Sequence, residues 1–397
     1  MVNIGKKYDI PQHFFWLHGP IAKPPVEYDE KTEMWNVYGY REAMEIFGDP
    51  ETYSSNTLRV TPKELLPDEG VSFDGFLTQV DPPDHSKLRK LVSSAFTRKV
   101  VADLEPRIAE ITCEFLDQAR ERDRFELVSD LAYPLPITVI AELLGVPSSD
   151  RGLFKAWADE LFKSDSTITR KASEKQQAQA QDRMRTWHEM SAYLGSHADE
   201  RRRRPRADLL TRLVEAEVDG ERLPDDQVVN FGILLLLAGH ITTTVLLGNT
   251  VLCLDAYPDE QRRARADRST IPDVIEESLR LLTPFAMMAR STTREVKLSG
   301  HKIGADELVL VWLAAANRDP LQFPDPELFV PGREHNPHLA FGRGIHFCLG
   351  APLARLEGRI AIDLLLDRFD DLRVEPGSSV ELIPTPTVTG VKRLHLA

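Results

Sequence analysis

The chain has 397 residues, with 49 basic and 62 acidic side chains and a formal net charge of −13 at pH 7. An acidic balance of this size argues against nucleic acid as a partner, and a 28% charged content without low-complexity tracts argues against disorder. With 42% hydrophobic residues the chain can bury a large core, and we expect a single domain over residues 1–397.

The N-terminal segment has no apolar stretch that could serve as a signal peptide or membrane anchor. Cys113, Cys253 and Cys348 have no paired spacing, so neither a disulfide framework nor a zinc site is expected. We therefore expect a cytoplasmic protein with reduced thiols. One basic block, residues 201–204 and Arg206, is expected to be a solvated loop and not a nucleic-acid-binding arm.

Helical patterns dominate the first two thirds of the chain. A short strand at residues 35–37 leads into a helix over residues 40–47. Residues 59–80 mix Pro, Gly and acidic side chains with poor periodicity, so a long loop is expected there. Helices follow over residues 86–251, with breaks expected around residues 134–136, 147 and 205.

The last third is more mixed. Strands are predicted at residues 295–298 and 307–313, with Ser299 and Gly300 supplying a turn after the first. An irregular Pro-rich stretch then runs to Pro337, and an ordered loop of that length usually carries function. A final helix over residues 349–369 has one apolar face, and short strands and turns follow from Val374.

The most apolar segment, residues 228–254, is long enough to cross a membrane. Its centre nevertheless reads Ala238-Gly-His-Ile-Thr-Thr-Thr244. A helix that is apolar all round but polar at its centre is typical of a buried helix that presents its polar step to a site. We therefore expect no membrane association.

The strongest motif is Phe341-Gly-Arg-Gly-Ile-His-Phe-Cys-Leu-Gly350. Its glycines allow tight turns and close approach to a flat ligand. Cys348 directly precedes a predicted helix, whose amides and dipole favour a thiolate. A lone cysteine beside glycines is more often a buried small residue. The combined spacing resembles the cysteine-ligand loop of the cytochromes P450, on Phe341, Gly342, Gly344, His346, Cys348 and Gly350.

This resemblance covers nearly the whole chain and implies a mainly α (α+β) fold, the helical P450 prism with a small β region. It implies haem b, iron protoporphyrin IX, with Cys348 as the metal ligand. The cofactor site would include Phe341, Gly342, His346 and Gly350. The segment 238–249 looks especially like actinomycete enzymes that tailor macrolides and other secondary metabolites.

The polar centre of the long helix resembles the family's oxygen-activating motif at Ala238, Gly239, Thr242 and Thr243. In isolation such threonines more often bond back to the preceding turn. The family's acidic position is occupied by Ile241, so protons must come through ordered water, the threonines, His240 or the substrate. His240 should point away from the haem on a regular helix, and we favour water or the substrate.

Buried haem propionates need cationic partners. The resemblance assigns this role to His85, Arg89, Arg290 and His346, although His85 and Arg89 alone would read as a solvated helix face. It also assigns a structural ion-pair network behind the cysteine loop to Glu277, Arg280 and Arg333.

The resemblance implies a monooxygenase that activates O2 and oxidises a C–H bond, by default a hydroxylation, of a secondary metabolite such as a macrolide. Alternatives are epoxidation, or oxidative C–N or C–C ring closure, of a peptide- or indole-type natural product. A haem-dependent isomerase or dehydratase is a minor option. A non-catalytic haem-binding sensor or carrier is the rival from another class, which Gly239 and Thr242 disfavour.

An apolar or amphipathic small-molecule substrate is expected from a pocket of Leu235, Ile241, Phe285, Met287, Met288 and Val388. The carboxylates of Asp68, Glu69 and Asp74 are expected to form an exposed acidic loop, with recognition of a substrate cation as the alternative. The chain has no flavin or iron–sulfur segment, so electrons from NAD(P)H must arrive through a ferredoxin and its reductase. Docking would use Lys87, Lys90, Arg343 and Arg355. We expect a monomer.

Overall fold

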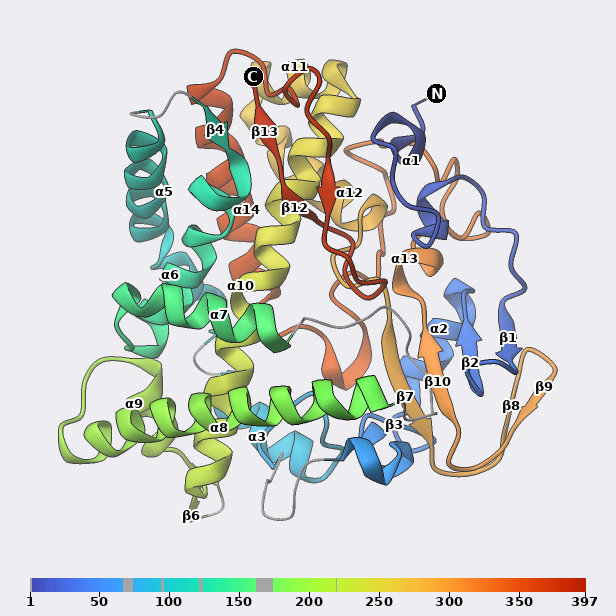
Figure 1. The fold of residues 1–397 in the computed structure, drawn as a ribbon, viewed down its shortest axis with the longest axis vertical. Coiled ribbons are helices and arrows are strands. Elements are labelled where there is room, and N and C mark those ends of the chain that lie inside the picture. The colour runs from blue at the N-terminus through green and yellow to red at the C-terminus, as the bar shows by residue number, and fades with distance from the viewer. Residues whose placement is uncertain (1, 67–73, 94–95, 121–123, 162–173, 219) are drawn as a thin grey trace.

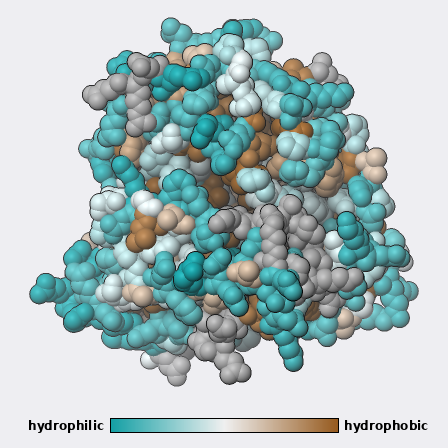
Figure 2. Space-filling view, in the orientation of Figure 1, coloured by the Kyte–Doolittle hydropathy of each residue, from teal (hydrophilic) through white to brown (hydrophobic). Residues whose placement is uncertain are grey.

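The computed structural model describes residues 2–66, 74–93, 96–120, 124–161, 174–218 and 220–397. Helices fill one side of the molecule and the largest sheet lies at the other, with the long helix α10 passing through the helical part (Figure 1). Hydrophilic residues cover most of the face in Figure 2, and hydrophobic residues show between them near its centre. The predicted acidic loop is only partly described, because Asp68 and Glu69 lie outside these ranges.

The described helices follow one another along the chain as α1 (Ile4–Lys7), α2 (Tyr40–Gly48), α3 (Asp84–Ser93), α4 (Arg98–Ala102), α5 (Glu105–Ala119), α6 (Pro134–Leu144), α7 (Arg151–Leu161), α8 (Glu174–Arg203), α9 (Leu209–Val214), α10 (Asp225–Ala256), α11 (Pro258–Ala266), α12 (Ile271–Leu281), α13 (Leu313–Ala316) and α14 (Ala351–Arg368). A π-helical turn, Val128–Ala132, precedes α6, and a 3₁₀ turn, Gly344–His346, lies inside the cysteine loop.

The largest sheet has the strand order β1 (Val26–Asp29), β2 (Met34–Val37), β10 (Leu308–Val311), β7 (Met288–Thr292) and β3 (Tyr53–Ser54). β10 pairs in parallel with β2, and the other pairs are antiparallel. Two-stranded pairs complete the β structure: β4 (Phe125–Glu126) with β13 (His395–Leu396), β5 (Glu217–Val218) with β6 (Glu221–Arg222), β8 (Val296–Leu298) with β9 (His301–Ile303), and β11 (Glu381–Leu382) with β12 (Val391–Arg393). The prediction of a mainly helical fold with a small β region is confirmed.

The break expected at residues 134–136 falls at a boundary between helices, because the π-helical turn ends at Ala132 and α6 begins at Pro134. A proline in the first turn gives up no hydrogen bond that the helix could have made. The prediction of a solvated loop for the arginine block was wrong in part, because α8 continues through Arg203, although Arg204 and Arg206 lie beyond it and are exposed. Arg201 is fully buried, and its Nε donates to Oδ2 of Asp208 at 2.6 Å.

α10 is the core helix of the molecule. Within the described residues it is the one helix long and apolar enough to cross a membrane, but 78% of its most apolar window is buried inside the protein. It contacts α6, α8, α12 and α14, among other elements. Its apolar composition is therefore explained by packing within the protein.

Candidate active site around Cys348

One cavity brings the predicted motifs together. It contains about 1310 Å³ of empty space, part of it open to solvent, and both α10 and the cysteine loop contribute to its lining. Thirteen of the residues singled out in the sequence line it: Arg89, Leu235, Ala238, Gly239, Thr242, Thr243, Phe285, Met288, Phe341, Gly342, His346, Cys348 and Gly350. Segments far apart in the sequence thus converge on a single space.

Three residues expected in the substrate pocket are absent from the described lining. Met287 packs against Met34 and Leu310, because successive side chains along an extended segment point to opposite sides. Ile241 packs against the main core, since each helical residue is rotated by about 100° from the one before it. Val388 is 2% exposed and forms an isolated β-bridge with Phe285.

Other lining residues were not singled out from the sequence. Phe231, Leu234 and Leu246 lie on the face of α10 that carries Thr242, so helical spacing from the polar centre could have found them. Leu77 and Thr78 come from a non-helical segment before α3, and Leu313 from the start of α13. No periodic signal in the sequence identifies those positions.

The cysteine loop is held in a tight conformation. Gly342 and Gly344 have φ values of +67° and +71°, which glycine adopts without strain. A Cβ at Gly344 would lie 2.2 Å from the carbonyl oxygen of Phe47, so this loop can pack against α2 only with glycine there. The amide of Cys348 donates to the carbonyl oxygen of Phe341 at 2.9 Å and closes the loop.

The environment of the Cys348 thiol suits a metal ligand. Burial raises the pKa of this thiol, while the amides of Gly350 and Ala351 and the positive charges of Arg89 and Arg355 act in the opposite direction. The thiolate is therefore supported by donors and cations but is costly to hold without a bound cation. A metal ion at the sulfur would remove that cost.

Of the four basic side chains assigned to the propionates, Arg89 and His346 line the cavity, and His85 and Arg290 lie close to His346 without lining it. The rings of His85 and His346 lie 4.2 Å apart between centroids, and Nε2 of His85 is buried without a hydrogen-bond partner among the described residues. Arg89 donates to the carbonyl oxygen of Phe347 at 2.6 Å. Arg290 donates to the carbonyl oxygen of its neighbour Ala289 at 2.8 Å.

The negative charge of Asp81 acts on Arg290 and His85, but within the described residues neither Arg89 nor Arg290 forms an ion pair with a carboxylate. Burial lowers the pKa of Arg290 to about 10. Burial, together with the charges of Arg290, His85 and Arg89, lowers the pKa of His346 to about 3. A buried positive cluster of this kind calls for an anion. The donor set therefore fits the haem that the resemblance implies, with its sulfur-bound iron and two propionates.

The threonine side chains at the polar centre of α10 donate to carbonyl oxygens of the preceding turn. Thr242 Oγ1 donates to the carbonyl oxygen of Ala238 at 3.0 Å, and Thr244 Oγ1 to that of His240 at 2.9 Å. A Cβ at Gly239 would lie 2.9 Å from Cγ1 of Ile140, so this glycine also lets α6 approach α10. Side-chain bonds of this kind compete with the helix ladder and often bend a helix.

His240 faces away from the cavity, as predicted. Its Nδ1 lies 2.5 Å from the carbonyl oxygen of Leu236, and its ring meets that of Tyr133 edge-on with centroids 5.6 Å apart. The side chain is completely buried, and burial lowers its pKa to about 4. His240 is therefore neutral at physiological pH and packs against the segment before α6.

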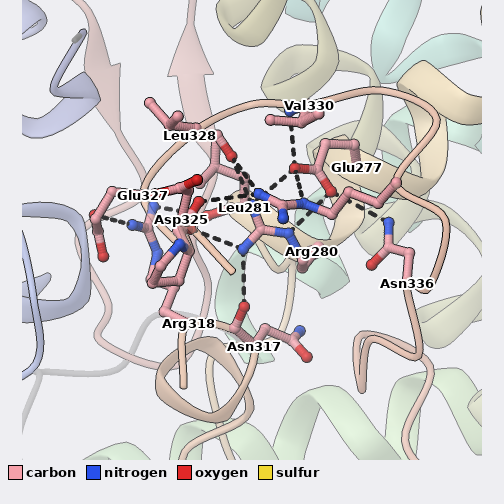
Figure 3. A network of polar contacts seen from close by, with 12 residues as sticks. Glu277, Arg280, Leu281, Asn317, Arg318, Asp325, Glu327, Leu328, Val330 and Asn336 are labelled. Atoms are coloured by element: carbon pink, nitrogen blue, oxygen red, sulfur yellow. Dashed lines mark hydrogen bonds and ion pairs between the residues drawn. The ribbon is translucent and has the colours of Figure 1, made fainter. Parts of the chain in front are cut away.

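Glu277 and Arg280 lie at the centre of a polar network (Figure 3). Arg333 joins this network through its ion pair with Glu277. Oε1 of Glu277 accepts from Arg280 Nη2 and from Arg333 Nε, each at 2.8 Å, and Arg280 Nε donates to Oε2 at 2.9 Å. Asn336, which was not singled out from the sequence, donates to Oε2 at 3.2 Å. α12 is thereby joined to the irregular stretch before the cysteine loop.

Comparison with known proteins agrees with this geometry. Residues 1–395 match the family model described as Cytochrome P450. The chain is 43% identical over 383 residues to Cyclomarin C epoxidase CymV of Salinispora arenicola, covering 96% of this chain and 95% of that protein. It is 42% identical to Erythromycin C-12 hydroxylase of Saccharopolyspora erythraea, covering 91% and 88%. The crystal structure of HmtN, a post-tailoring hydroxylase involved in himastatin biosynthesis, matches with a TM-score of 0.87 and 51% identity, covering 100% and 99%.

Proposed function

Since the chain belongs to the cytochrome P450 family, we propose that it hydroxylates an unactivated C–H bond of a macrolide-type product. As a monooxygenase of this group it tailors secondary metabolites. The observation that carries the proposal is the mostly apolar cavity that Cys348, Gly239 and Thr242 line together. The similarity to Erythromycin C-12 hydroxylase supports a macrolide substrate.

Haem, when bound, supplies the reductive activation of dioxygen. The chain's own contribution begins with the Cys348 sulfur, which would hold the iron, while His85, Arg89, Arg290 and His346 would hold the propionates. Leu235 and Phe285 would orient the substrate and exclude water, because both are apolar and line the cavity.

The described lining contains no carboxylate. Thr242 is the nearest candidate for holding a proton, because its hydroxyl can turn from the carbonyl oxygen of Ala238 towards the cavity. Ile241 supplies no proton, and His240 faces the opposite side of α10. This arrangement supports proton delivery by ordered water or by a polar group of the substrate, with Thr242 and Thr243 as intermediate donors.

Electrons would come from NAD(P)H through a ferredoxin reductase and a ferredoxin that docks on the cysteine side. Lys87, Lys90 and Arg343 are exposed there, and Phe347, next to the ligand cysteine, is 39% exposed. A cationic rim around an apolar contact suits an acidic partner. Arg355 is less available for docking, because Glu276 already binds its guanidinium.

The single domain, the cytoplasmic location and the monomeric state of the protein stay predictions.

A second candidate is epoxidation, or C–N or C–C ring closure, of a peptide- or indole-type product. The 43% identity to Cyclomarin C epoxidase favours epoxidation. These reactions would use the same cavity, so the choice depends on which bond of the substrate lies nearest to Cys348 and Thr242.

Difference spectra of the purified holoprotein with erythromycin B, cyclomarin C and himastatin would test the proposal. A macrolide substrate predicts a spectral shift with erythromycin B, followed by a product that has gained one oxygen atom. A shift with cyclomarin C and an epoxide product would support the second candidate. A product that has lost two hydrogen atoms would indicate ring closure. Ligand binding without consumption of oxygen and reductant would indicate a sensor or carrier.

A further inference from the structure

Arg355 lies on α14, and its guanidinium is held from two sides. Nε and Nη2 donate to Oε1 and Oε2 of Glu276 on α12, at 2.6 and 2.8 Å. Cζ lies 4.5 Å from the centre of the Phe341 ring. A bidentate bond to a carboxylate fixes the plane of the guanidinium, and a cation above an aromatic ring is attracted by the electrons of its face.

Phe341 connects this arrangement to the ligand cysteine. Its carbonyl oxygen accepts from the amide of Cys348 at 2.9 Å, and both residues line the cavity. Arg355 therefore contacts a residue that is itself bonded to the cysteine. A displacement of the Phe341 ring would be transmitted to the loop that positions the sulfur.

Glu276 also holds the segment that enters the cysteine loop. Nε2 of His338 lies 3.0 Å from Oε2 of Glu276, and Nδ1 accepts from the amide of Ala340 at 3.3 Å. Because Nδ1 accepts, Nε2 carries the hydrogen and donates to the carboxylate. One carboxylate thus binds a side chain that precedes the loop and a side chain that follows it.

The charges involved are partly shielded from water. The side chain of Arg355 is 39% exposed and that of Glu276 is 31% exposed. Interactions between charges are stronger at such positions than in bulk water. The positive charge of Arg355 lies against Phe341 of the cysteine loop, and the carboxylate of Glu276 partly offsets that charge.

We propose that Arg355 and Glu276 are positioning residues that hold Phe341 against the cysteine loop and set the reduction potential of the bound haem. The inference rests on the proposed haem function. Reduction adds one electron to the site, so a nearby cation stabilises the reduced state and raises the potential, and a nearby carboxylate lowers it. Removing the positive charge of Arg355 must therefore lower the reduction potential, and removing the negative charge of Glu276 must raise it.

Spectroelectrochemical titration of the purified holoprotein tests this inference. Arg355→Met should shift the potential to a more negative value, and Glu276→Gln to a more positive one. Arg355→Lys keeps the charge but loses the bidentate bond and the planar stack. Its potential should therefore lie between those of the wild type and Arg355→Met.

The neighbouring ion pair provides a matched control. Arg359 on α14 binds Glu105 at 2.7 Å, and the groove that contains this pair is also lined by Arg355 and Glu276. Within the described residues Arg359, unlike Arg355, does not stack on an aromatic ring. Arg359→Met and Glu105→Gln should therefore leave the potential close to the wild-type value.

Haem content and the reduced carbon monoxide spectrum are measured first for every protein. A wild-type protein without the thiolate band would overturn the haem proposal and this inference together. With the band present, shifts of the same sign in Arg355→Met and Glu276→Gln would overturn this inference alone. Shifts no larger than those of the control pair would do the same. If Arg355→Met does not fold, Arg355→Lys and Glu276→Gln still decide, because the inference requires opposite shifts from these two variants.

Discussion

Glu277 and Arg280 are both fully buried on α12, and two hydrogen bonds of 2.8 and 2.9 Å join their charged groups. The spacing of three residues is that of an ordinary surface pair on a helix. Here Glu277 also binds Arg333, and Arg280 donates to the carbonyl oxygens of Asn317 and Pro326. The pair is therefore the centre of a network that fixes the chain before the cysteine loop.

Glu277→Gln should destabilise the protein strongly, because it leaves two buried guanidinium groups without a carboxylate. Removing one partner of a buried ion pair costs about 3–5 kcal/mol. Denaturant unfolding of the holoprotein measures this, with Asp259→Asn as the control for the exposed pair Arg262–Asp259. An exposed pair contributes about 0.2–1 kcal/mol. Equal losses in the two variants would contradict the role of the network.

Cys348→Ser should abolish the thiolate signature of the reduced carbon monoxide complex, because an alcohol is a far weaker ligand than a thiolate. Absorption spectra of the purified variant measure the effect, and substrate oxidation should be lost with the band. Cys253→Ser is the control, since Cys253 is buried and does not line the cavity. A thiolate spectrum that survives in Cys348→Ser would show that another residue is the ligand.

Thr242→Ala should keep haem and substrate binding but divert reducing equivalents into peroxide or water, because the cavity loses a hydroxyl that holds a proton. The ratio of product to NAD(P)H consumed measures this coupling. Thr244→Ala is the control, since Thr244 makes the same kind of backbone bond but does not line the described cavity. Unchanged coupling in Thr242→Ala would indicate that Thr243 or an ordered water molecule, and not Thr242, holds the proton.

Arg290→Leu and His85→Leu should weaken haem retention, because each change leaves a propionate without a partner. An unsatisfied buried polar group costs about 1–3 kcal/mol, and more when it is charged. Transfer of haem to apomyoglobin measures the loss. Arg294→Leu is the control, since the side chain of Arg294 is 70% exposed. If both Arg290→Leu and His85→Leu retained haem as well as the wild type, the assignment of these residues as propionate partners would be wrong.

His240 predicts a specific dependence of stability on pH. Burial lowers its pKa from 6.5 to about 4, so between these values the unfolded chain binds a proton that the native protein does not. The free energy of unfolding must therefore fall as pH is lowered through this window. His240→Asn should make this fall shallower and leave the dependence above pH 6.5 unchanged. If the free energy of unfolding of the wild type and of His240→Asn fell equally steeply between pH 6.5 and 4, the ring would be protonated in the native state as readily as in the unfolded chain.

Much of the chemistry could be predicted from local patterns. The loop around Cys348, the polar centre of the long helix and the order of the main helices have short-range signals, because glycine positions and helical periodicity depend on neighbouring residues. The sequence also showed that Ile241 occupies the position where the family's oxygen-activating motif has an acidic residue. Several short strands were missed, among them β1, β3 and β7 of the largest sheet. The strands β3 and β7 pair with each other, and β7 also with β10, so their formation depends on partners elsewhere in the sequence.

The sequence by itself determined which residue types were available: a cysteine before a helix, threonines at its polar centre, and basic residues in several separate motifs. Only the tertiary structure decided which of them meet. It turned Met287 away from the cavity, buried Arg201 against Asp208, and placed Arg355 between Glu276 and Phe341. The physical reason is that burial and charge pairing depend on distances through space, and packing sets those distances between segments far apart in the chain.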